Sequence, residues 1–445
     1  MISVAPTKEE KARLLNVTKD VLAEIEKETG EIDSRIRPAL LGSASRDTWL
    51  LDEKDVDIFL MFPLEYEKER MEEIVTGIGM KILKDVTKRY AEHPYVRGIY
   101  RDFEIEIVPC YAVDSPQNMK SAVDRTPFHD AFVKRHIRGK EDEVRLLKQF
   151  LKGTGCYGAE SRVEGFSGYL CELLVIKYGS FEGVLNAAGD WQRGHVVWIG
   201  DTGELKKFPE PLVFIDPVDK NRNVASALSL TKLSGFIFAA GRYLEEPHDE
   251  FFFPKKREVG RTGIIRKFES RGTDAIAIIF ETPDIVDDIL YPQLKRAAGA
   301  IEKLLLRSDF QVSGIDFFVG ERTCIFIELG GIEIPEMRLH MGPEVNTPHE
   351  QRFLSKYKDF DGKLTEPFIR GDRWAIFLKR KCTNAKVLLS DFLSQAHLEK
   401  KGMPKYVAKA IEGGYAIKEG KDAIPAEFAE DLLEYFDPRF TWESP

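Results

Sequence analysis

Residues 55–62 read DVDIFLMF, and this alternation of acidic and apolar side chains is typical of a β-strand. Successive side chains of a strand point to opposite faces, so Asp55 and Asp57 share one face while Val56, Ile58 and Leu60 point to the other. The sequence therefore predicts two carboxylates side by side on a strand whose other face is buried.

A second acidic stretch follows in FEIEIVPCY, residues 103–111. The same alternation places Glu104 and Glu106 on one face. If the two strands are neighbours, three or four acids converge on one surface. Clustered carboxylates repel one another unless a divalent cation neutralises them, and their hard oxygen atoms suit Mg²⁺. The pattern predicts a metal site, with an edge strand that carries acids for solubility as the alternative.

The dipeptide Gly42-Ser43 precedes these acids and directly follows the apolar stretch 36–41. A glycine lets the backbone approach a ligand closely, and N–H groups with a serine hydroxyl at the start of a helix can hold a phosphate. Most such dipeptides are merely turns. The acids that follow Gly42-Ser43 favour the phosphate-binding interpretation over a plain turn.

The chain length of 445 residues predicts two to four domains, and the predicted elements suggest three. A helix at 7–29 precedes the strands of the first part, and a helix at 66–91 lies between the strand at 55–62 and a hairpin at 95–108. The middle part is mainly helical, and Ser167 is a candidate N-cap within it. The third part combines strands, beginning at 274–280, with helices and a helical tail. We therefore expect an α+β fold with domains at 1–140, 141–255 and 256–445.

Composition limits the possible functions. Lys and Arg number 65 against 74 Asp and Glu, a formal net charge of −9, so binding to a polyanion must rest on local basic patches. The five scattered cysteines support neither a disulfide framework nor a structural zinc site. The N-terminus does not resemble a signal peptide, and no apolar run reaches the ~20 residues that span a bilayer. We expect a cytoplasmic protein without membrane association.

Longer segments carry a resemblance to a known family. GSASRDTWL followed by DVDIFLMF is similar to the signature of the polymerase-beta-like nucleotidyltransferases. RTPFH, GFSGYLCELL and DPVDKNRNVA resemble the archaeal, class I CCA-adding tRNA nucleotidyltransferases. The likeness runs from residue 41 to 294 in the family's order and fades after residue 300. It implies a polymerase-beta-like catalytic head, a helical central domain and an α+β C-terminal body with a helical tail.

The resemblance also implies an activity, the addition of CCA to the 3′ end of tRNA from CTP and ATP without a template. By similarity, Asp55, Asp57 and Glu106 hold two Mg²⁺ ions, one lowering the pKa of the attacking hydroxyl and one neutralising the triphosphate. The family often has Asp at the third position, and Glu104 competes for that role. We prefer Glu106 because it directly precedes the segment IVPCY, as in the family.

Further residues are implied to bind the nucleotide. Cationic and hydroxyl side chains suit a triphosphate, and an arginine can also donate to the edge of the incoming base. The implied set is Gly42, Ser43, Arg46, Thr126, His129, Lys148, Tyr157 and Arg222.

Each side chain of this set also has a structural interpretation. Arg46 could pair with a surface acid, and Arg222 could pair with Asp216 or Asp219 in its own loop. A solvated or packed position is the alternative for Lys148 and the other side chains.

Short basic clusters interrupt the acidic chain and would supply contacts to RNA, with a strong salt dependence. By resemblance, the region after residue 274 holds the acceptor and T-arm of tRNA by shape. The candidates there are Lys295, Arg296 and Arg338, and the family suggests a homodimer. The rivals are a poly(A) polymerase or oligoadenylate synthetase-like enzyme, and a non-catalytic RNA-binding protein on the same scaffold.

Overall fold

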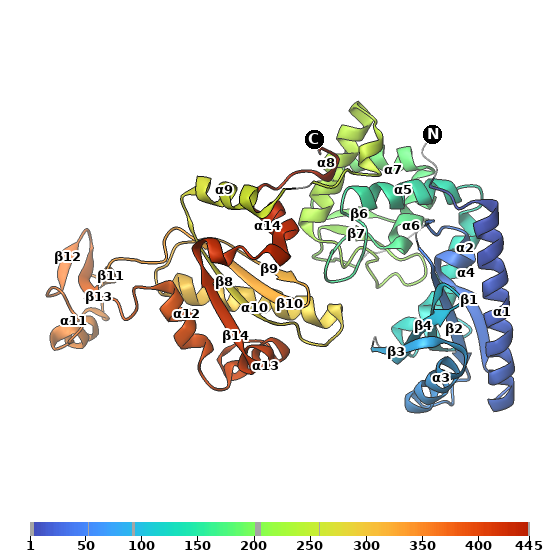
Figure 1. The fold of residues 1–445 in the computed structure, drawn as a ribbon, viewed down its shortest axis with the longest axis horizontal. Helices are drawn as coiled ribbons and strands as arrows, with labels where there is room; N and C mark the ends of the chain where they lie inside the picture. Colours follow the sequence, from blue (N-terminus) through green and yellow to red (C-terminus); the bar gives the residue numbers. More distant parts are fainter. Residues whose placement is uncertain (1–3, 52, 91–93, 201–205, 258, 444–445) are drawn as a thin grey trace. The chain divides into compact units, whose positions relative to one another are not determined.

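The computed structural model describes residues 4–51, 53–90, 94–200, 206–257 and 259–443. The chain folds into two compact units. The first contains Met1–Arg257 together with Phe440–Pro445, and the second contains Glu258–Arg439. Figure 1 labels the elements of both units, and each unit has its own sheets and hydrophobic core.

The first unit begins with a five-stranded sheet in the order β1-β2-β5-β4-β3. β2 and β5 run parallel, and the other neighbours are antiparallel. Helices α1 and α3 pack on the face that carries the apolar side chains of β2 and β5. The elements are α1 (Lys8–Ile32), β1 (Arg37–Leu41), α2 (Gly42–Arg46), β2 (Asp55–Phe62), α3 (Lys68–Ile82), β3 (Lys84–Tyr90), β4 (Pro94–Tyr100) and β5 (Phe103–Tyr111).

The predicted helix 66–91 is wrong in its second half. α3 ends at Ile82, and the segment KDVTKRY forms the edge strand β3. The pairing of β3 with β4 shifts register between Lys84 and Thr87, and Asp85 between them has a left-handed φ of 50°. The strand owes its conformation to pairing with β4, which helical periodicity in the sequence does not reveal.

The rest of the first unit is mainly helical and has an aromatic core, in which Phe150 stacks on Phe251 with ring centroids 5.7 Å apart. The Ser167 hydroxyl accepts a hydrogen bond from the Leu170 N–H at 3.1 Å, so the predicted N-cap of α6 is confirmed. The elements are α4 (Thr126–His136), α5 (Glu141–Gly153), α6 (Gly168–Tyr178), α7 (Phe181–Ala188), β6 (His195–Val197), β7 (Leu212–Phe214) and α8 (Leu230–Glu245).

The second unit is built on an antiparallel sheet in the order β14-β8-β10-β9. β8 and β10 are buried on both faces, because α10, α12 and α13 cover one face and α9 and α14 the other. The elements are α9 (Arg261–Arg271), β8 (Asp274–Glu281), α10 (Asp287–Arg307), β9 (Val312–Val319), β10 (Arg322–Leu329), α12 (Ala385–Leu393), α13 (Lys405–Gly413), β14 (Tyr415–Glu419) and α14 (Ala429–Phe436).

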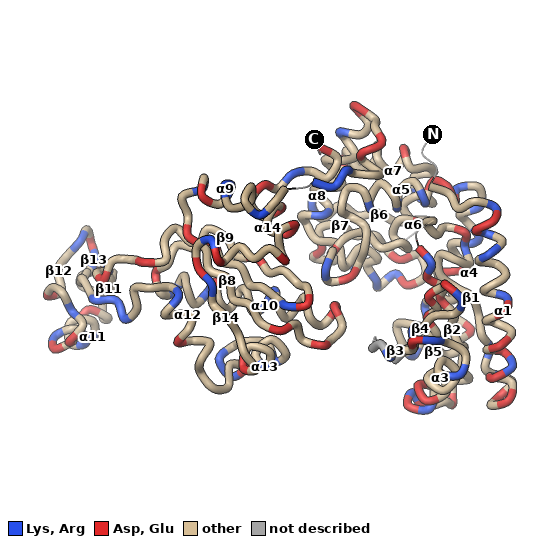
Figure 2. The backbone as a smooth tube through the Cα atoms, viewed as in Figure 1, with Lys and Arg blue, Asp and Glu red and all other residues tan. Residues whose placement is uncertain are grey.

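A smaller sheet in the order β11-β13-β12 belongs to the same unit, and α11 packs on it. Residues 374–378 lie in β13 of this sheet and not in the larger one. The elements are β11 (Met337–Glu344), α11 (Glu350–Lys358), β12 (Phe368–Arg370) and β13 (Arg373–Lys379). No helix in the described part of the chain is long and apolar enough to cross a membrane. Figure 2 shows acidic and basic residues interspersed along both units.

Candidate active site

The two acidic strands lie side by side, which meets the condition under which the sequence brings their acids together. β2 and β5 pair in parallel register, with Asp55 opposite Glu104 and Asp57 opposite Glu106. The four carboxylates stand on the face of the sheet opposite to α1 and α3, because the intervening apolar residues point into the core. The pairing brings together all the acids that the sequence nominates as metal ligands.

The Gly42-Ser43 bend lies directly against this acidic face. β1 pairs with β2 so that Leu41 stands opposite Asp57, and Gly42 follows with a left-handed φ of 75°. A Cβ atom at Gly42 would lie 1.9 Å from Oδ2 of Asp57, so only glycine fits this position. The Asp57 carboxylate can therefore keep this position only if residue 42 is a glycine.

Arg97 of β4 lies among the acids, and the sequence analysis did not identify it. It stands opposite Glu106, and its guanidinium forms an ion pair with Glu104. Its Nη2 lies 3.8 Å from Oδ1 of Asp55, and its Nε lies 3.8 Å from Oε1 of Glu106. Within the described residues, no three His, Cys, Asp or Glu side chains form a preassembled metal-binding group.

The electrostatics of the acidic face favour a bound cation. Partial burial and the negative charge of Asp57 raise the pKa of Glu106 to about 7. Burial also raises the pKa of Asp57, while the positive charges of Arg46 and Lys148 lower it. Crowded, partly desolvated carboxylates of this kind are stabilised in their charged form by a nearby cation, and their oxygen atoms suit a hard divalent ion. The donor set therefore fits the metal that the family implies.

Arg46 is held by two buried acids. Its Nη1 lies 3.0 Å from Oδ1 of Asp130, and its Nε lies 2.9 Å from Oε1 of Glu172. The same Glu172 oxygen accepts a hydrogen bond from the Thr48 hydroxyl at 2.5 Å. Ser45 donates to Asp130 as well. The ion-pair interpretation of Arg46 thus describes its contacts, although its partners are buried rather than on the surface.

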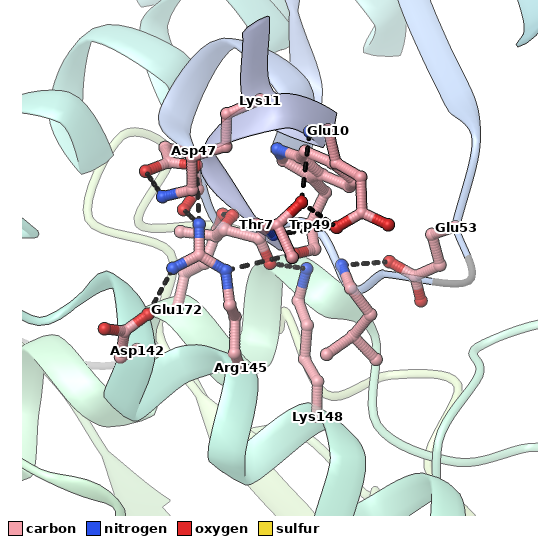
Figure 3. A network of polar contacts seen from close by, with 12 residues as sticks. Thr7, Glu10, Lys11, Asp47, Trp49, Glu53, Asp142, Arg145, Lys148 and Glu172 are labelled. Atoms are coloured by element: carbon pink, nitrogen blue, oxygen red, sulfur yellow. Dashed lines mark hydrogen bonds and ion pairs between the residues drawn. The ribbon is translucent and has the colours of Figure 1, made fainter. Parts of the chain in front are cut away.

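Lys148 and Arg145 extend from α5 toward the segment that follows α2, as Figure 3 shows. The Lys148 ammonium group donates to the Thr48 carbonyl at 2.9 Å and is buried. Arg145, also buried, donates to the carbonyl of Trp49 at 3.1 Å and pairs with Asp47 at 2.6 Å. The two cations hold this segment against α5, and the solvated position considered for Lys148 does not occur.

Tyr157 lies close to Lys148 across Gly168. A Cβ atom at Gly168 would lie 3.2 Å from the Tyr157 hydroxyl and 3.5 Å from Nζ of Lys148. Burial and the charge of Glu53 keep the pKa of Tyr157 well above its usual range, so the phenol remains protonated. The phenol is thus able to donate a hydrogen bond at any physiological pH.

The Asp216 carboxylate contacts both His129 and Arg222. Its Oδ2 lies 2.8 Å from Nε2 of His129 and 2.8 Å from Nη1 of Arg222, and Tyr169 stacks on His129 at 4.2 Å. Burial would raise the pKa of Asp216, but these bonds and the Val218 N–H hold it below its usual value. Arg222 thus makes one of the two loop pairs considered for it, and its side chain remains one-third exposed.

The remaining candidates are dispersed. Thr126 is the first residue of α4. Lys295 and Arg296 are exposed in the middle of α10. Arg338 on β11 lines a cavity of about 510 Å³ that Lys379 and several other basic residues share, and Lys295 and Arg296 are not part of its lining.

The site residues that sequence analysis missed are the partners of charged groups. Alternation in β4 places Arg97 on one face, but only the pairing of β4 with β5 sets it among the acids. Asp130 and Glu172 lie within or close to the matched motifs, yet their role as partners of Arg46 depends on contacts distant in sequence. The sequence suggests the ion pair of Asp216 with Arg222 only as an alternative to nucleotide binding by Arg222.

Three family models match the chain. The nucleotidyltransferase domain matches residues 22–129, the second domain of tRNA nucleotidyltransferase matches residues 142–253, and the C-terminal domain of the CCA-adding enzyme matches residues 271–420. Together they account for both units of the chain. A nucleotidyltransferase domain implies that a divalent metal ion is used.

Curated relatives match over most of their length. A CCA-adding enzyme of Methanosarcina mazei is 38% identical over 94% of this chain and 92% of the relative. A CCA-adding enzyme of Archaeoglobus fulgidus is 41% identical over 88% of this chain and 89% of the relative. With this coverage, and with the acidic strands and the glycine bend in place, the chain belongs to the family of CCA-adding enzymes.

Proposed function

We propose that Asp55, Asp57 and Glu106 form the centre with which this chain adds C, C and A to the 3′ end of tRNA. The reaction consumes CTP twice and then ATP, releases pyrophosphate at each step and uses no nucleic-acid template. The observation that supports this centre best is the register in which Asp57 stands opposite Glu106 while Gly42 leaves room beside it. Acids that served only for solubility would not need a glycine bend against them.

The proposed metal is Mg²⁺, bound as two ions by these three carboxylates. Hard oxygen donors on adjacent strands suit Mg²⁺, and the mutual repulsion of the acids favours a cation among them. Bound there, Mg²⁺ supplies Lewis acidity toward the primer hydroxyl and the triphosphate. The paired strands of the chain place the carboxylates on one face of the sheet before substrate arrives.

The nucleotide is proposed to lie between the acidic face and α4 to α6. Lys148 and Arg46 place positive charge near Asp57, and the Tyr157 phenol is a permanent donor. Asp216 holds His129 and the partly exposed Arg222 in fixed orientation, which suits contacts to the phosphates and the base. Gly42, Ser43 and Thr126 complete the proposed nucleotide-binding set.

The tRNA contacts are proposed for the third domain, 256–445, which follows a catalytic domain at 1–140 and a helical domain at 141–255. Lys295, Arg296 and Arg338 are candidate contacts to the RNA backbone, because each is a cationic side chain that is at least partly exposed. A homodimer and a cytoplasmic site of action are further proposals that rest on the family resemblance.

The test uses tRNA that lacks its CCA end, labelled CTP alone, and then CTP with ATP. The wild-type chain should add two C residues and then one A. Asp57→Asn should reduce incorporation by at least ~1,000-fold without loss of tRNA binding, because the metal loses a ligand at the reacting centre. Asp102→Asn, at an exposed carboxylate paired with Arg13, is the matched control and should behave as wild type.

Other results have defined meanings in this assay. An enzyme specific for A would incorporate no label from CTP alone, and a non-catalytic RNA-binding protein would incorporate none from either nucleotide. An active Asp57→Asn variant would contradict the assignment of the centre.

A further inference from the structure

Arg97 lies on β4, the strand that borders the acidic pair β2 and β5, and its side chain reaches toward the acids. β4 runs beside β5, so Arg97 stands opposite Glu106, and its guanidinium reaches diagonally to pair with Glu104. The guanidinium also lies 3.8 Å from the carboxylate of Asp55 and 3.8 Å from that of Glu106. A single cation thus faces three of the four acids.

The bonding of Arg97 is incomplete. Its Nε is buried and has no hydrogen-bond partner among the described residues. A buried guanidinium donor without a partner carries a desolvation cost, and a purely structural arginine would be expected to satisfy it. The geometry therefore suggests that charge, more than hydrogen bonding, places Arg97 at this position.

The charges of the acidic face also indicate that Arg97 acts through its positive charge. Four carboxylates on two adjacent strands repel one another strongly when all are ionised. Arg97 offsets one of these charges without closing the site, since its side chain remains about one-third exposed. A cation that is covalently part of β4 is present whether or not a metal ion is bound.

We propose that Arg97 is a positioning residue, a tethered counter-cation that stabilises the acidic face in the absence of metal and engages Glu104, so that Glu106 is the third ligand beside Asp55 and Asp57. The inference rests on the proposed function only in taking these acids as the metal site. Glu104 is bound by the guanidinium, whereas Glu106 is 3.8 Å from Nε and makes no hydrogen bond with it.

Two consequences follow for the protein without nucleotide or tRNA. Because Arg97 and the metal ion are like charges near the same carboxylates, removing Arg97 should tighten metal binding. Because the acids then lack their counter-cation, the metal-free protein should become less stable, and metal should restore the lost stability. A merely structural arginine would show the loss of stability without the gain in metal affinity.

The experiment titrates the full-length chain with Mn²⁺ alone and measures free Mn²⁺ by electron paramagnetic resonance. Arg97→Met should bind Mn²⁺ about tenfold more tightly than wild type, and Arg97→Lys, which keeps the charge, should stay within about threefold. Arg101→Met is the matched control, because Arg101 pairs with Asp20 on α1 at 2.8 Å and its loss should leave Mn²⁺ affinity unchanged.

The role of Glu106 is tested in the same titration. Glu106→Gln should weaken Mn²⁺ binding by at least about tenfold, and Glu104→Gln by less than about threefold, because only the former removes a ligand. Weaker binding in Glu104→Gln than in Glu106→Gln would overturn the assignment. Unchanged or weaker Mn²⁺ affinity in Arg97→Met would overturn the proposal that Arg97 acts as a counter-cation.

Thermal unfolding in EDTA and in Mn²⁺ gives a second readout that does not depend on activity. Arg97→Met should unfold at a lower temperature than wild type in EDTA and at the wild-type temperature in saturating Mn²⁺. A midpoint that Mn²⁺ fails to restore contradicts the proposal. Loss of Mn²⁺ binding is also expected in Asp57→Asn, and normal binding there would contradict the metal centre itself, whatever Arg97 does.

Discussion

At the scale of single residues, Gly42 shows how little space the site leaves beside Asp57. Gly42→Ala adds a Cβ that would lie 1.9 Å from Oδ2 of Asp57, at a φ of 75°. The left-handed backbone alone costs a non-glycine residue about 1–2 kcal/mol. Displacing the carboxylate should also lower CMP incorporation by about 100-fold, since small misplacements have effects of this size. Denaturant unfolding and single-turnover kinetics measure the two effects.

Gly77→Ala is the control for this substitution. Gly77 lies within α3, and a methyl group added there would meet no atom within 4 Å, so alanine should stabilise the helix by about 0.5–1 kcal/mol and leave incorporation unchanged. Normal activity in Gly42→Ala would show that the bend tolerates a side chain and that its contact with Asp57 is not required.

Arg46 provides a prediction about stability. Its guanidinium is 8% exposed and bridges Asp130 and Glu172, which are 5% and 0% exposed. Arg46→Met removes the cation that pairs with the fully buried Glu172 and leaves Asp130 paired with Lys134 at 2.8 Å, which should lower the free energy of unfolding by about 3–5 kcal/mol. Urea unfolding measures the loss. Arg242→Met, at an exposed pair with Glu245, should cost less than about 1 kcal/mol.

A small effect of Arg46→Met would mean that the two acids find other partners or become protonated. In that case Arg46 would be available for substrate at little cost to the fold. The comparison with Arg242→Met separates this outcome from a general insensitivity of the protein to the loss of an arginine.

At the scale of elements, β2 shows what sequence can predict. The strand spans Asp55–Phe62 as predicted, because alternation records which side chains meet the core. Ser167 is likewise recognisable as a cap from its position before an apolar run. β3 carries a helical pattern yet forms a strand, because an exposed edge strand takes its conformation from its neighbour. Local pattern thus predicts elements that face the core better than it predicts edges.

The candidate site could be predicted to a similar degree. Paired acids and a glycine bend are visible in sequence because each is a short, contiguous pattern. The ion pair of Arg97 with Glu104 and that of Arg46 with Glu172 were not predictable, since one depends on strand register and the other on contacts between separate elements. Such pairs follow from the assembled fold rather than from any local stretch.

The N-cap of α6 links an element to the site. α6 carries Tyr169 and Glu172, which contact Asp216 and Arg46. Ser167→Ala removes the cap and should cost about 1 kcal/mol of stability, with a raised KM for CTP because these contacts loosen. Ser229→Ala removes the equivalent cap of α8 and is the control.

The two cap substitutions should therefore differ only in their effect on the KM for CTP. Ser229 accepts from the Lys232 N–H at 3.3 Å, so its loss should have a similar effect on unfolding. It should not change KM, since α8 carries none of the proposed nucleotide-binding residues. Equal KM values for both variants would contradict a link between α6 and nucleotide binding.

At the scale of the whole molecule, the negative net charge of the chain opposes the binding of tRNA. A chain with a net charge of −9 repels a polyanion at long range, so tRNA binding must depend on local groups of basic residues. Binding through such groups releases counterions from the RNA and weakens as salt rises. The salt dependence therefore reports how many basic residues contact phosphate.

The double variant Lys295→Gln, Arg296→Gln should weaken tRNA binding and reduce the slope of log K against log salt by roughly 1–2, because up to two phosphate contacts are lost. Filter binding between about 50 and 200 mM KCl, a range over which such slopes are resolved, measures it. The KM for CTP should not change. Arg322→Gln, which breaks an exposed pair with Glu427 in the same unit, is the control. An unchanged slope in the double variant would remove these residues from the RNA surface and leave Arg338 as the remaining candidate.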